Sequence, residues 1–122
     1  MLTIDPRSPI PLGEQVRRGL RRAIAEGELS PDDPLPPVRQ LAADLGVNLN
    51  TVARAYRELE REGLVVTARG RGTVVAARRT LARLPHDDLC LRVRDLLADA
   101  KLSGYRKEEM RQLVVAELER RM

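Results

Sequence analysis

The fold is decided by a stretch in the first half of the chain, where residues 38–63 read VRQLAADLGVNLNTVARAYRELEREG. Apolar residues recur there every three or four positions, first up to Leu45 and again from Val52 onward. This spacing predicts two amphipathic helices. Gly46 can adopt the left-handed backbone conformation that often ends an α-helix, so it suits the end of the first helix, and Gly63 suits the end of the second. The stretch therefore predicts a helix-turn-helix.

A further helix is predicted upstream, between Pro11 and Gly27. Its apolar face is formed by Leu12, Val16, Leu20, Ala23 and Ile24. The segment 30–37 contains four prolines, which predicts a rigid connector. We expect the first helix of the helix-turn-helix to begin near Pro37, because proline is accepted in a first helical turn.

Downstream of the helix-turn-helix the pattern changes from helical to extended. Residues 64–67 read LVVT and residues 73–76 read TVVA, and both runs are rich in β-branched side chains. The intervening segment 68–72, ARGRG, supplies the glycines of a turn. The sequence therefore predicts a β-hairpin that follows the helix-turn-helix as a wing.

A helical pattern is expected to return from about residue 79, with a break at Ser103–Gly104. It predicts two amphipathic helices whose apolar stripes contain Leu89, Val93, Leu96 and Leu97 in the first, and Met110, Leu113, Val114 and Leu118 in the second. The predicted fold is mainly α with a small β-hairpin, a winged helix-turn-helix domain at 1–77 followed by a two-helix tail at 78–122. Two helices cannot bury both stripes alone, so we expect the tail to form a homodimer.

The composition restricts the partners of the chain. There are 22 basic and 18 acidic residues, for a net charge of +4, and no Asp or Glu occurs from Gly63 to His86. The chain has two tyrosines and no Trp or Phe, so a base-stacking surface for single-stranded nucleic acid is lacking. The aromatic content therefore favours duplex DNA over RNA.

Cellular location is predicted from what the sequence lacks. It has one cysteine, no basic and apolar leader after Met1, and no apolar run near the roughly 20 residues that span a bilayer. We expect a cytoplasmic protein without a membrane partner.

Polar residues gather at the start of the second helix of the helix-turn-helix. Asn48, Asn50, Thr51 and Arg54 are expected to be exposed there, while Val52, Tyr56 and Leu59 face the core. A helix in the major groove reads base edges with side chains at its N-terminal end, so this segment is predicted to be a recognition helix. The alternative is that the two asparagines only cap the helix.

The tip of the predicted hairpin reads Arg69-Gly70-Arg71-Gly72. Two guanidinium groups beside glycines allow a close backbone approach to the minor groove. A hairpin turn requires glycine in any case, so a purely structural role is the alternative. A phosphate-binding nucleotide loop should open a helix, whereas this one leads into a β run.

The motifs resemble the DNA-binding domain of the GntR family. The resemblance covers residues 10–76 and is carried by LPPVRQLA at 35–42, LGV at 45–47, NTVARAYRELEREGL at 50–64 and RGRGT at 69–73. It implies a repressor that binds an operator palindrome as a homodimer. It also implies that Arg39 contacts a phosphate or a guanine, that the helix from Asn50 enters the major groove, and that residues 70–72 enter the minor groove.

The resemblance has two departures and one refinement. The family's usual Pro-Gly-Asp-Arg is Pro-Asp-Asp-Pro here, at 31–34, which puts a phosphate contact there in doubt. Pro37 stands where a Ser often caps the helix. The short two-helix tail resembles the YtrA type of the family.

Other readings of the chain have less support. His86 and Cys90 are four residues apart and can share a metal on a helix, but two ligands make a weak site. We expect no metal, no cofactor and no enzymatic activity, because no nucleophile or acid-base constellation is recognisable. The main rival is a winged helix used for contact with another protein, which requires an exposed apolar recognition face. The sequence does not identify an effector.

Overall fold

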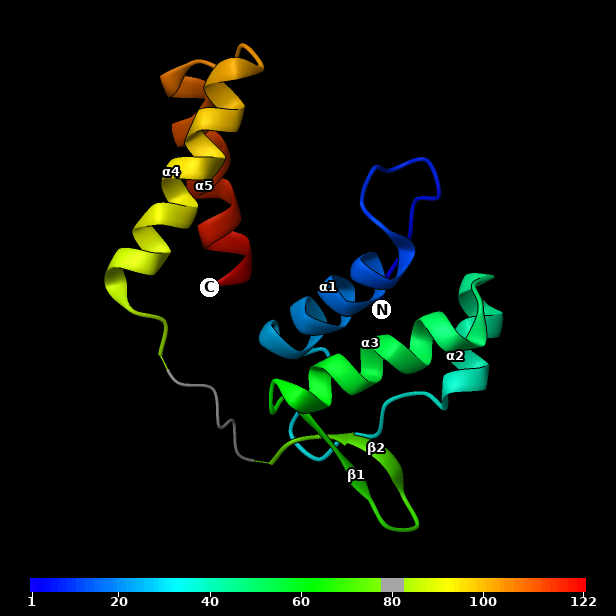
Figure 1. Cartoon of the computed structure of the whole chain (residues 1–122). Coiled ribbons are helices and arrows are strands. Elements are labelled where there is room, and N and C mark those ends of the chain that lie inside the picture. The colour runs from blue at the N-terminus through cyan, green and yellow to red at the C-terminus, as the bar shows by residue number, and fades with distance from the viewer. Residues whose placement is uncertain (78–82) are drawn as a thin grey trace. The chain divides into compact units, whose positions relative to one another are not determined.

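The computed structural model describes residues 1–77 and 83–122. Contacts between Cα atoms divide the chain into two compact units, Met1–Leu81 and Ala82–Met122 (Figure 1). Each unit is described by itself below. The domain boundary expected between residues 77 and 78 adjoins residues outside the described ranges and stays a prediction.

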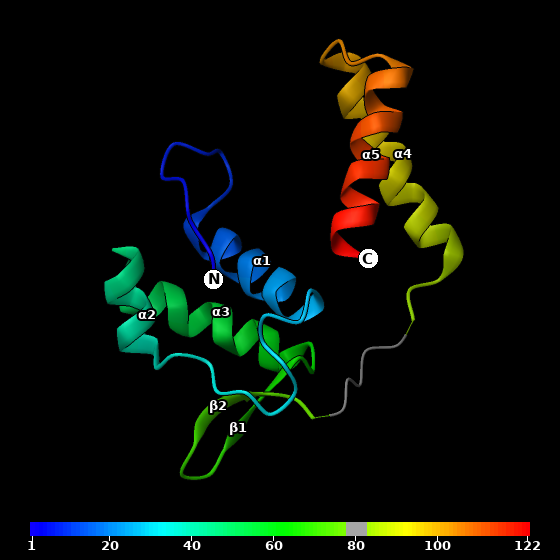
Figure 2. The ribbon, with the colours of Figure 1, turned by 180° about the vertical axis from the view of Figure 1, so that it is seen from behind.

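The described residues of the first unit form three helices and one hairpin. They are α1 (Leu12–Ala25), α2 (Val38–Leu45), α3 (Leu49–Arg61), β1 (Val65–Ala68) and β2 (Gly72–Val75). Helices α1 and α3 lie side by side, α2 packs against α3, and β1 contacts α3, as both ribbon views show (Figures 1 and 2). This arrangement confirms the predicted winged helix-turn-helix.

The core of this unit joins all of its elements. Val16 and Leu20 of α1 are fully buried against Val52 and Leu59 of α3. Val65 and Val75 close the core from the hairpin. Burying a branched aliphatic side chain stabilises the fold by about 1.5–3 kcal/mol. These contacts therefore set the position of α3 on the other helices.

The turn between α2 and α3 is made by a glycine and an asparagine. Gly46 has a φ of 68°, in the left-handed region that glycine enters without steric cost. Asn48 caps α3, since its side-chain oxygen accepts a 2.7 Å hydrogen bond from the backbone N–H of Asn50. The predicted glycine turn and the Asn48 cap are confirmed. Asn50 lies inside the helix, so its reading as a cap was wrong.

The wing is an antiparallel hairpin in which Val65 pairs with Val75 and Ala68 pairs with Gly72. Both strands are displaced by one residue from the predicted 64–67 and 73–76 because Ala68 and Gly72 continue the ladder. The connector before α2 runs along β2. The N–H of Leu35 donates to the carbonyl of Thr73 over 2.8 Å, and Pro34 bridges to Val74.

The second unit is a helical hairpin of α4 (His86–Leu102) and α5 (Lys107–Arg121), which run side by side in both ribbon views. Helix was expected from about residue 79. Residues 79–82 lie outside the described ranges, and the expectation was wrong for residues 83–85, which are not helical. Proline disfavours helical backbone at the residue before it, here Leu84, and α4 begins after its N-cap Pro85. None of the described helices has the length and apolar character needed to cross a membrane.

Neither helix of the second unit contains a fully buried residue. Apolar side chains also extend beyond the predicted stripes, since Leu91 and Leu102 of α4 and Val115 of α5 are exposed. The prediction of a single apolar stripe on each helix was therefore incomplete. The hairpin presents more apolar surface than its two helices cover for each other.

Candidate nucleic-acid interface

The polar residues predicted for DNA contact lie at the exposed start of α3. Asn48, Asn50 and Arg54 are exposed, and Thr51 is partly exposed. Val52, on the opposite side of the helix, is fully buried. The predicted separation into a polar outer face and an apolar inner face is therefore present.

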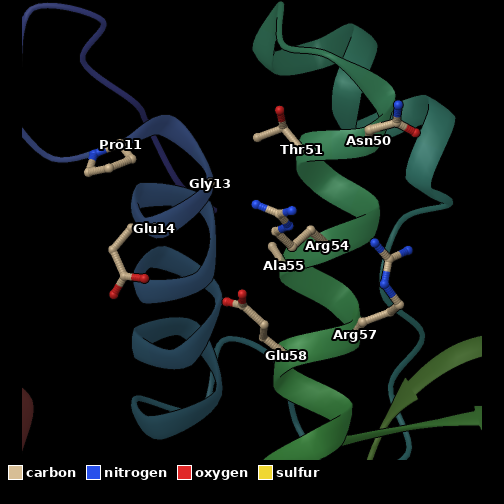
Figure 3. Close-up of a pocket in the computed structure, with 9 residues that line it drawn as sticks. All are labelled: Pro11, Gly13, Glu14, Asn50, Thr51, Arg54, Ala55, Arg57 and Glu58. Carbon is tan, nitrogen blue, oxygen red and sulfur yellow. The ribbon is translucent and has the colours of Figure 1, made fainter.

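A groove of about 650 Å³ lies between the first turn of α1 and the outer face of α3 (Figure 3). Its lining residues are Pro11, Gly13, Glu14, Asn50, Thr51, Arg54, Ala55, Arg57 and Glu58. Figure 3 shows Thr51 and Arg54 on the side of α3 that borders α1. A Cβ atom added to Gly13 would lie 3.6 Å from Cγ2 of Thr51, so the two helices approach closely here.

The groove brings together Asn50, Thr51 and Arg54, which were predicted as site residues. Arg57 also lines it but was not predicted as one. Its position three residues after Arg54 places it on the same part of the helix surface, so helical spacing could have identified it. Contributions from α1 could not be found in this way, because no local pattern brings α1 to α3.

Three exposed arginines, one on α2 and two on the outer face of α3, have no partner in the described residues, whereas two carboxylates at the C-terminal end of α3 are paired. Arg39, Arg54 and Arg57 are exposed and make no ion pair within residues 1–77 and 83–122. In contrast, Glu62 lies 2.8 Å from Arg17 of α1, and Glu58 lies 3.7 Å from the same guanidinium. The outer face of α3 therefore offers uncompensated positive charge.

Arg17 also pairs with Glu14 of its own helix. Hydrogen bonds from Arg17 and then from Arg18 lower the pKa of Glu14 from 4.5 to about 2. Arg21 lies 3.4 Å from Glu62 and extends the cluster. This ionic cluster links α1 to the C-terminal end of α3.

Arg39 is in the first turn of α2, and the start of that helix is tied to the middle of α3. The hydroxyl of Tyr56 donates a 2.5 Å hydrogen bond to the carbonyl oxygen of Pro36. Burial raises the pKa of Tyr56 to about 12, so the phenol stays protonated and remains a donor. The hydrogen bond positions the segment that carries Arg39 relative to α3.

At the wing, the predicted residues Arg69, Gly70, Arg71 and Gly72 are all exposed. Gly70 and Gly72 have φ values of 76° and 72°, which explains the glycines at this tip. Arg69 has no partner in the described residues. Arg71 instead donates a 2.9 Å hydrogen bond to the backbone carbonyl of Asp32. The two wing arginines therefore differ in their surroundings.

The residues predicted for dimerisation are accessible in the second unit. Leu89, Val93, Leu96, Leu97, Leu113, Val114 and Leu118 are exposed, and Met110 is partly exposed. A groove of about 710 Å³ collects part of this surface, with Val93 and Leu97 from α4 facing Met110 and Val114 from α5. Four basic residues also line it: Lys101, Arg106, Lys107 and Arg111.

The candidate metal pair lies on the first turn of α4. Sγ of Cys90 is 3.3 Å from Nε2 of His86. Within the part of the chain that the structure describes, no group of three or more His, Cys, Asp or Glu side chains is placed to hold a metal ion. The absence of a metal site stays a prediction.

Comparison with known proteins identifies the type of domain. Residues 12–75 match the family model described as bacterial regulatory proteins, gntR family. The chain is 38% identical over 116 residues to the HTH-type transcriptional repressor YtrA of Bacillus subtilis, covering 93% of this chain and 89% of that protein. The similarity therefore extends through the tail.

Two solved structures are also similar. YtrA from Sulfolobus acidocaldarius, a GntR-family transcription factor, has a TM-score of 0.63 and 36% identity over 80% of this chain and 97% of that one. The AraR DNA-binding domain in complex with operator ORX1 has a TM-score of 0.55 and 31% identity, covering 62% of this chain and 93% of that one. The second similarity relates the first unit to a domain seen on operator DNA.

Proposed function

This chain belongs to the GntR family of bacterial regulatory proteins and is a DNA-binding transcriptional regulator, and we propose that it represses transcription as a homodimer on a palindromic operator. The observation that carries the proposal is the outer face of α3, where Arg54 and Arg57 are unpaired while Glu58 and Glu62 are neutralised from α1. Such a face attracts the phosphate backbone and leaves polar side chains free for base edges.

In the proposed complex, the N-terminal half of α3 enters the major groove. Asn50, Thr51 and Arg54 are then the candidates for base contact, because they border the groove at the start of the helix. Asn48 caps α3 and can contact DNA in addition, since its amide nitrogen remains available. Arg39 contributes a phosphate or guanine contact from α2.

The wing is proposed to enter the adjacent minor groove through residues 69–72. Arg69 and Arg71 supply positive charge, and the two glycines keep the tip narrow enough for a close approach. These contacts grip the backbone and read little sequence. The wing therefore contributes general affinity, and α3 contributes specificity.

Dimerisation is proposed to occur through the domain at 78–122. The apolar side chains of α4 and α5 are largely exposed in one copy, which is costly unless another surface covers them. A second copy of the hairpin completes a bundle under two-fold symmetry. Two recognition helices are then expected roughly 34–36 Å apart, one turn of DNA.

Repression itself is inferred from the YtrA repressor of Bacillus subtilis, which is similar over most of its length. A regulator of this kind acts where the chromosome is, so we propose the cytoplasm as its location. No cofactor is needed for this function.

Footprinting on the promoter of its own gene tests the proposal directly. We expect protection of an inverted repeat by the dimer and a steep loss of affinity as salt rises, because phosphate contacts release counterions. A reporter behind the protected site should be silenced when the protein is expressed. An affinity that does not change with salt concentration, or no protection at any protein concentration, would instead favour a winged helix that contacts another protein.

A further inference from the structure

The wing arginine Arg71 contacts both the backbone and the carboxylate of Asp32 in its own chain. Its Nη2 donates a 2.9 Å hydrogen bond to the backbone oxygen of Asp32, and its Nη1 lies 3.5 Å from Oδ1 of the same residue. The two residues are 39 positions apart in the sequence. We propose that the Asp32 carboxylate competes with DNA phosphate for Arg71 and thereby restrains the affinity of the wing for DNA.

The position of Asp32 beside the wing is determined by the backbone. Its N–H donates to the carbonyl of Val75 over 2.9 Å, and the N–H of Val75 donates to the carbonyl of Asp33 over 2.8 Å. This pair of hydrogen bonds adds the connector to the edge of β2. These backbone bonds place Asp32 beside β2.

Asp32 has a left-handed backbone conformation. Its φ is 72°, and within the described residues it is the only residue other than glycine with a positive φ. Glycine adopts this conformation most easily and aspartate is one of the few other residues that enter it, so the backbone accepts both residues at this position. Its side chain pairs with Arg71 and, in the described part of the chain, with no other group.

Both partners are open to solvent, with 52% of the Arg71 side chain and 66% of the Asp32 side chain exposed. An exposed ion pair of this kind is weak and is screened by salt. A phosphate oxygen can therefore replace the carboxylate on the guanidinium. The exchange leaves a negative carboxylate close to the DNA backbone, which opposes binding.

Arg69 provides an internal contrast, because it has the same chemistry and no carboxylate beside it. The proposal therefore concerns one arginine of the wing. It rests on the proposed DNA-binding function and deepens it, since it identifies the residue that sets how strongly the wing binds phosphate.

The decisive variant is Asp32→Asn, which removes the charge and keeps the backbone carbonyl that accepts from Arg71. We expect about two- to fivefold tighter binding to both operator and random duplex at about 0.1 M salt, the size expected from an exposed ion pair. The gain should shrink as salt rises, because the internal pair is screened even in the parent protein. Asp32→Gly should behave in the same way and unfold at a higher temperature.

Two controls separate competition from a general effect of charge. Glu28 is exposed in the loop between α1 and α2, and the side chain of Arg71 contacts Asp32 instead. Glu28→Gln therefore removes one negative charge and should tighten binding less than Asp32→Asn. In an Arg71→Ala background, Asp32→Asn should increase the affinity for duplex DNA by no more than Glu28→Gln does. Equal gains with and without Arg71, or no gain from Asp32→Asn, would overturn the proposal.

The outcome also distinguishes this inference from the proposed function. If the parent binds duplex DNA and Arg71→Ala weakens it, while Asp32→Asn matches the parent, only the competition is wrong. Weaker binding by Asp32→Asn would show that the carboxylate orients Arg71 for DNA, the opposite role. If the parent itself does not bind duplex DNA, the proposed function fails first.

Discussion

The hydroxyl of Tyr56 donates a 2.5 Å hydrogen bond to the carbonyl oxygen of Pro36, joining the middle of α3 to the residue before the N-cap of α2. The two residues are 20 positions apart. The ring of Tyr56 is buried among the core residues, so its direction is set by side-chain packing. This contact relates the position of Arg39 to that of the recognition helix.

Replacing Tyr56 by Phe should lower the free energy of unfolding by about 1–3 kcal/mol, because the Pro36 carbonyl loses its partner in a partly buried place. Urea unfolding measures this change. Tyr105→Phe is the matched control, since that side chain is exposed, and it should alter stability by less than about 0.5 kcal/mol. Equal effects of the two substitutions would show that the Tyr56 hydrogen bond contributes nothing.

Stability should also depend on pH through Glu14. Its pKa is lowered in the folded protein from 4.5 to about 2, so the folded state holds this carboxylate ionised more readily than the unfolded state. The resulting stabilisation is present above about pH 4.5 and is lost as pH falls toward 2. Thermal unfolding across that range should show the loss.

Arg17→Met tests the cause of that pH dependence. It removes the positive charge that pairs with Glu14, Glu58 and Glu62. We therefore expect the free energy of unfolding to be about 1–3 kcal/mol lower near pH 7 and to fall less steeply as the pH is lowered. Arg18→Met removes a more exposed partner of Glu14 alone and should have a smaller effect. If Arg18→Met costs more than Arg17→Met, the link between α1 and α3 is not the stabilising element.

Two substitutions of Asn48 should distinguish its role as a helix cap from a contact with DNA. Asn48→Ala is expected to cost about 1 kcal/mol of stability, whereas Asn48→Asp should retain the cap, because a carboxylate accepts the Asn50 N–H and favours a helix N-terminus. On DNA, Asn48→Asp should bind more weakly than the parent, since it adds a negative charge. Unfolding curves and duplex titrations, taken together, check both parts. A stable Asn48→Asp that binds DNA like the parent would remove Asn48 from the interface.

Arg39→Ala and Arg54→Ala should each weaken operator binding by about 1–3 kcal/mol without loss of helix content, as expected when a specific contact is removed. Fluorescence anisotropy with a labelled operator measures the affinity. Arg22→Ala, an exposed arginine near the end of α1, is the control for loss of one positive charge. Affinities that fall no further than in this control would refute the assignment to the major groove.

Truncation after Ala77 should yield a monomer that retains the winged helix, because the core of the first unit lies in residues 1–77. The monomer is expected to bind one half-site weakly, since the second half-site no longer benefits from a linked copy. Sedimentation of the full-length and truncated chains at one concentration decides the matter. A monomeric full-length chain, or a truncated chain that still dimerises, would show that the tail is not the interface.

Much of the fold could be predicted from local patterns in the sequence. The three-and-four spacing of apolar residues predicted α1, α2 and α3, and the β-branched runs predicted the wing to within one residue. Gly46 was expected at a left-handed position and is found there. Errors arose where a local rule was overlooked, as at Pro85, which delays the start of α4.

The sequence by itself determined the order of the helices and strands, the polar face of α3 and the family, because each follows from residues that are neighbours in the chain or one helical turn apart. Only the tertiary structure decided which charges are free. Arg17 reaches Glu62 across 45 positions, and Arg71 reaches Asp32 across 39. No periodicity encodes such pairs, since they form only after core packing brings distant segments together.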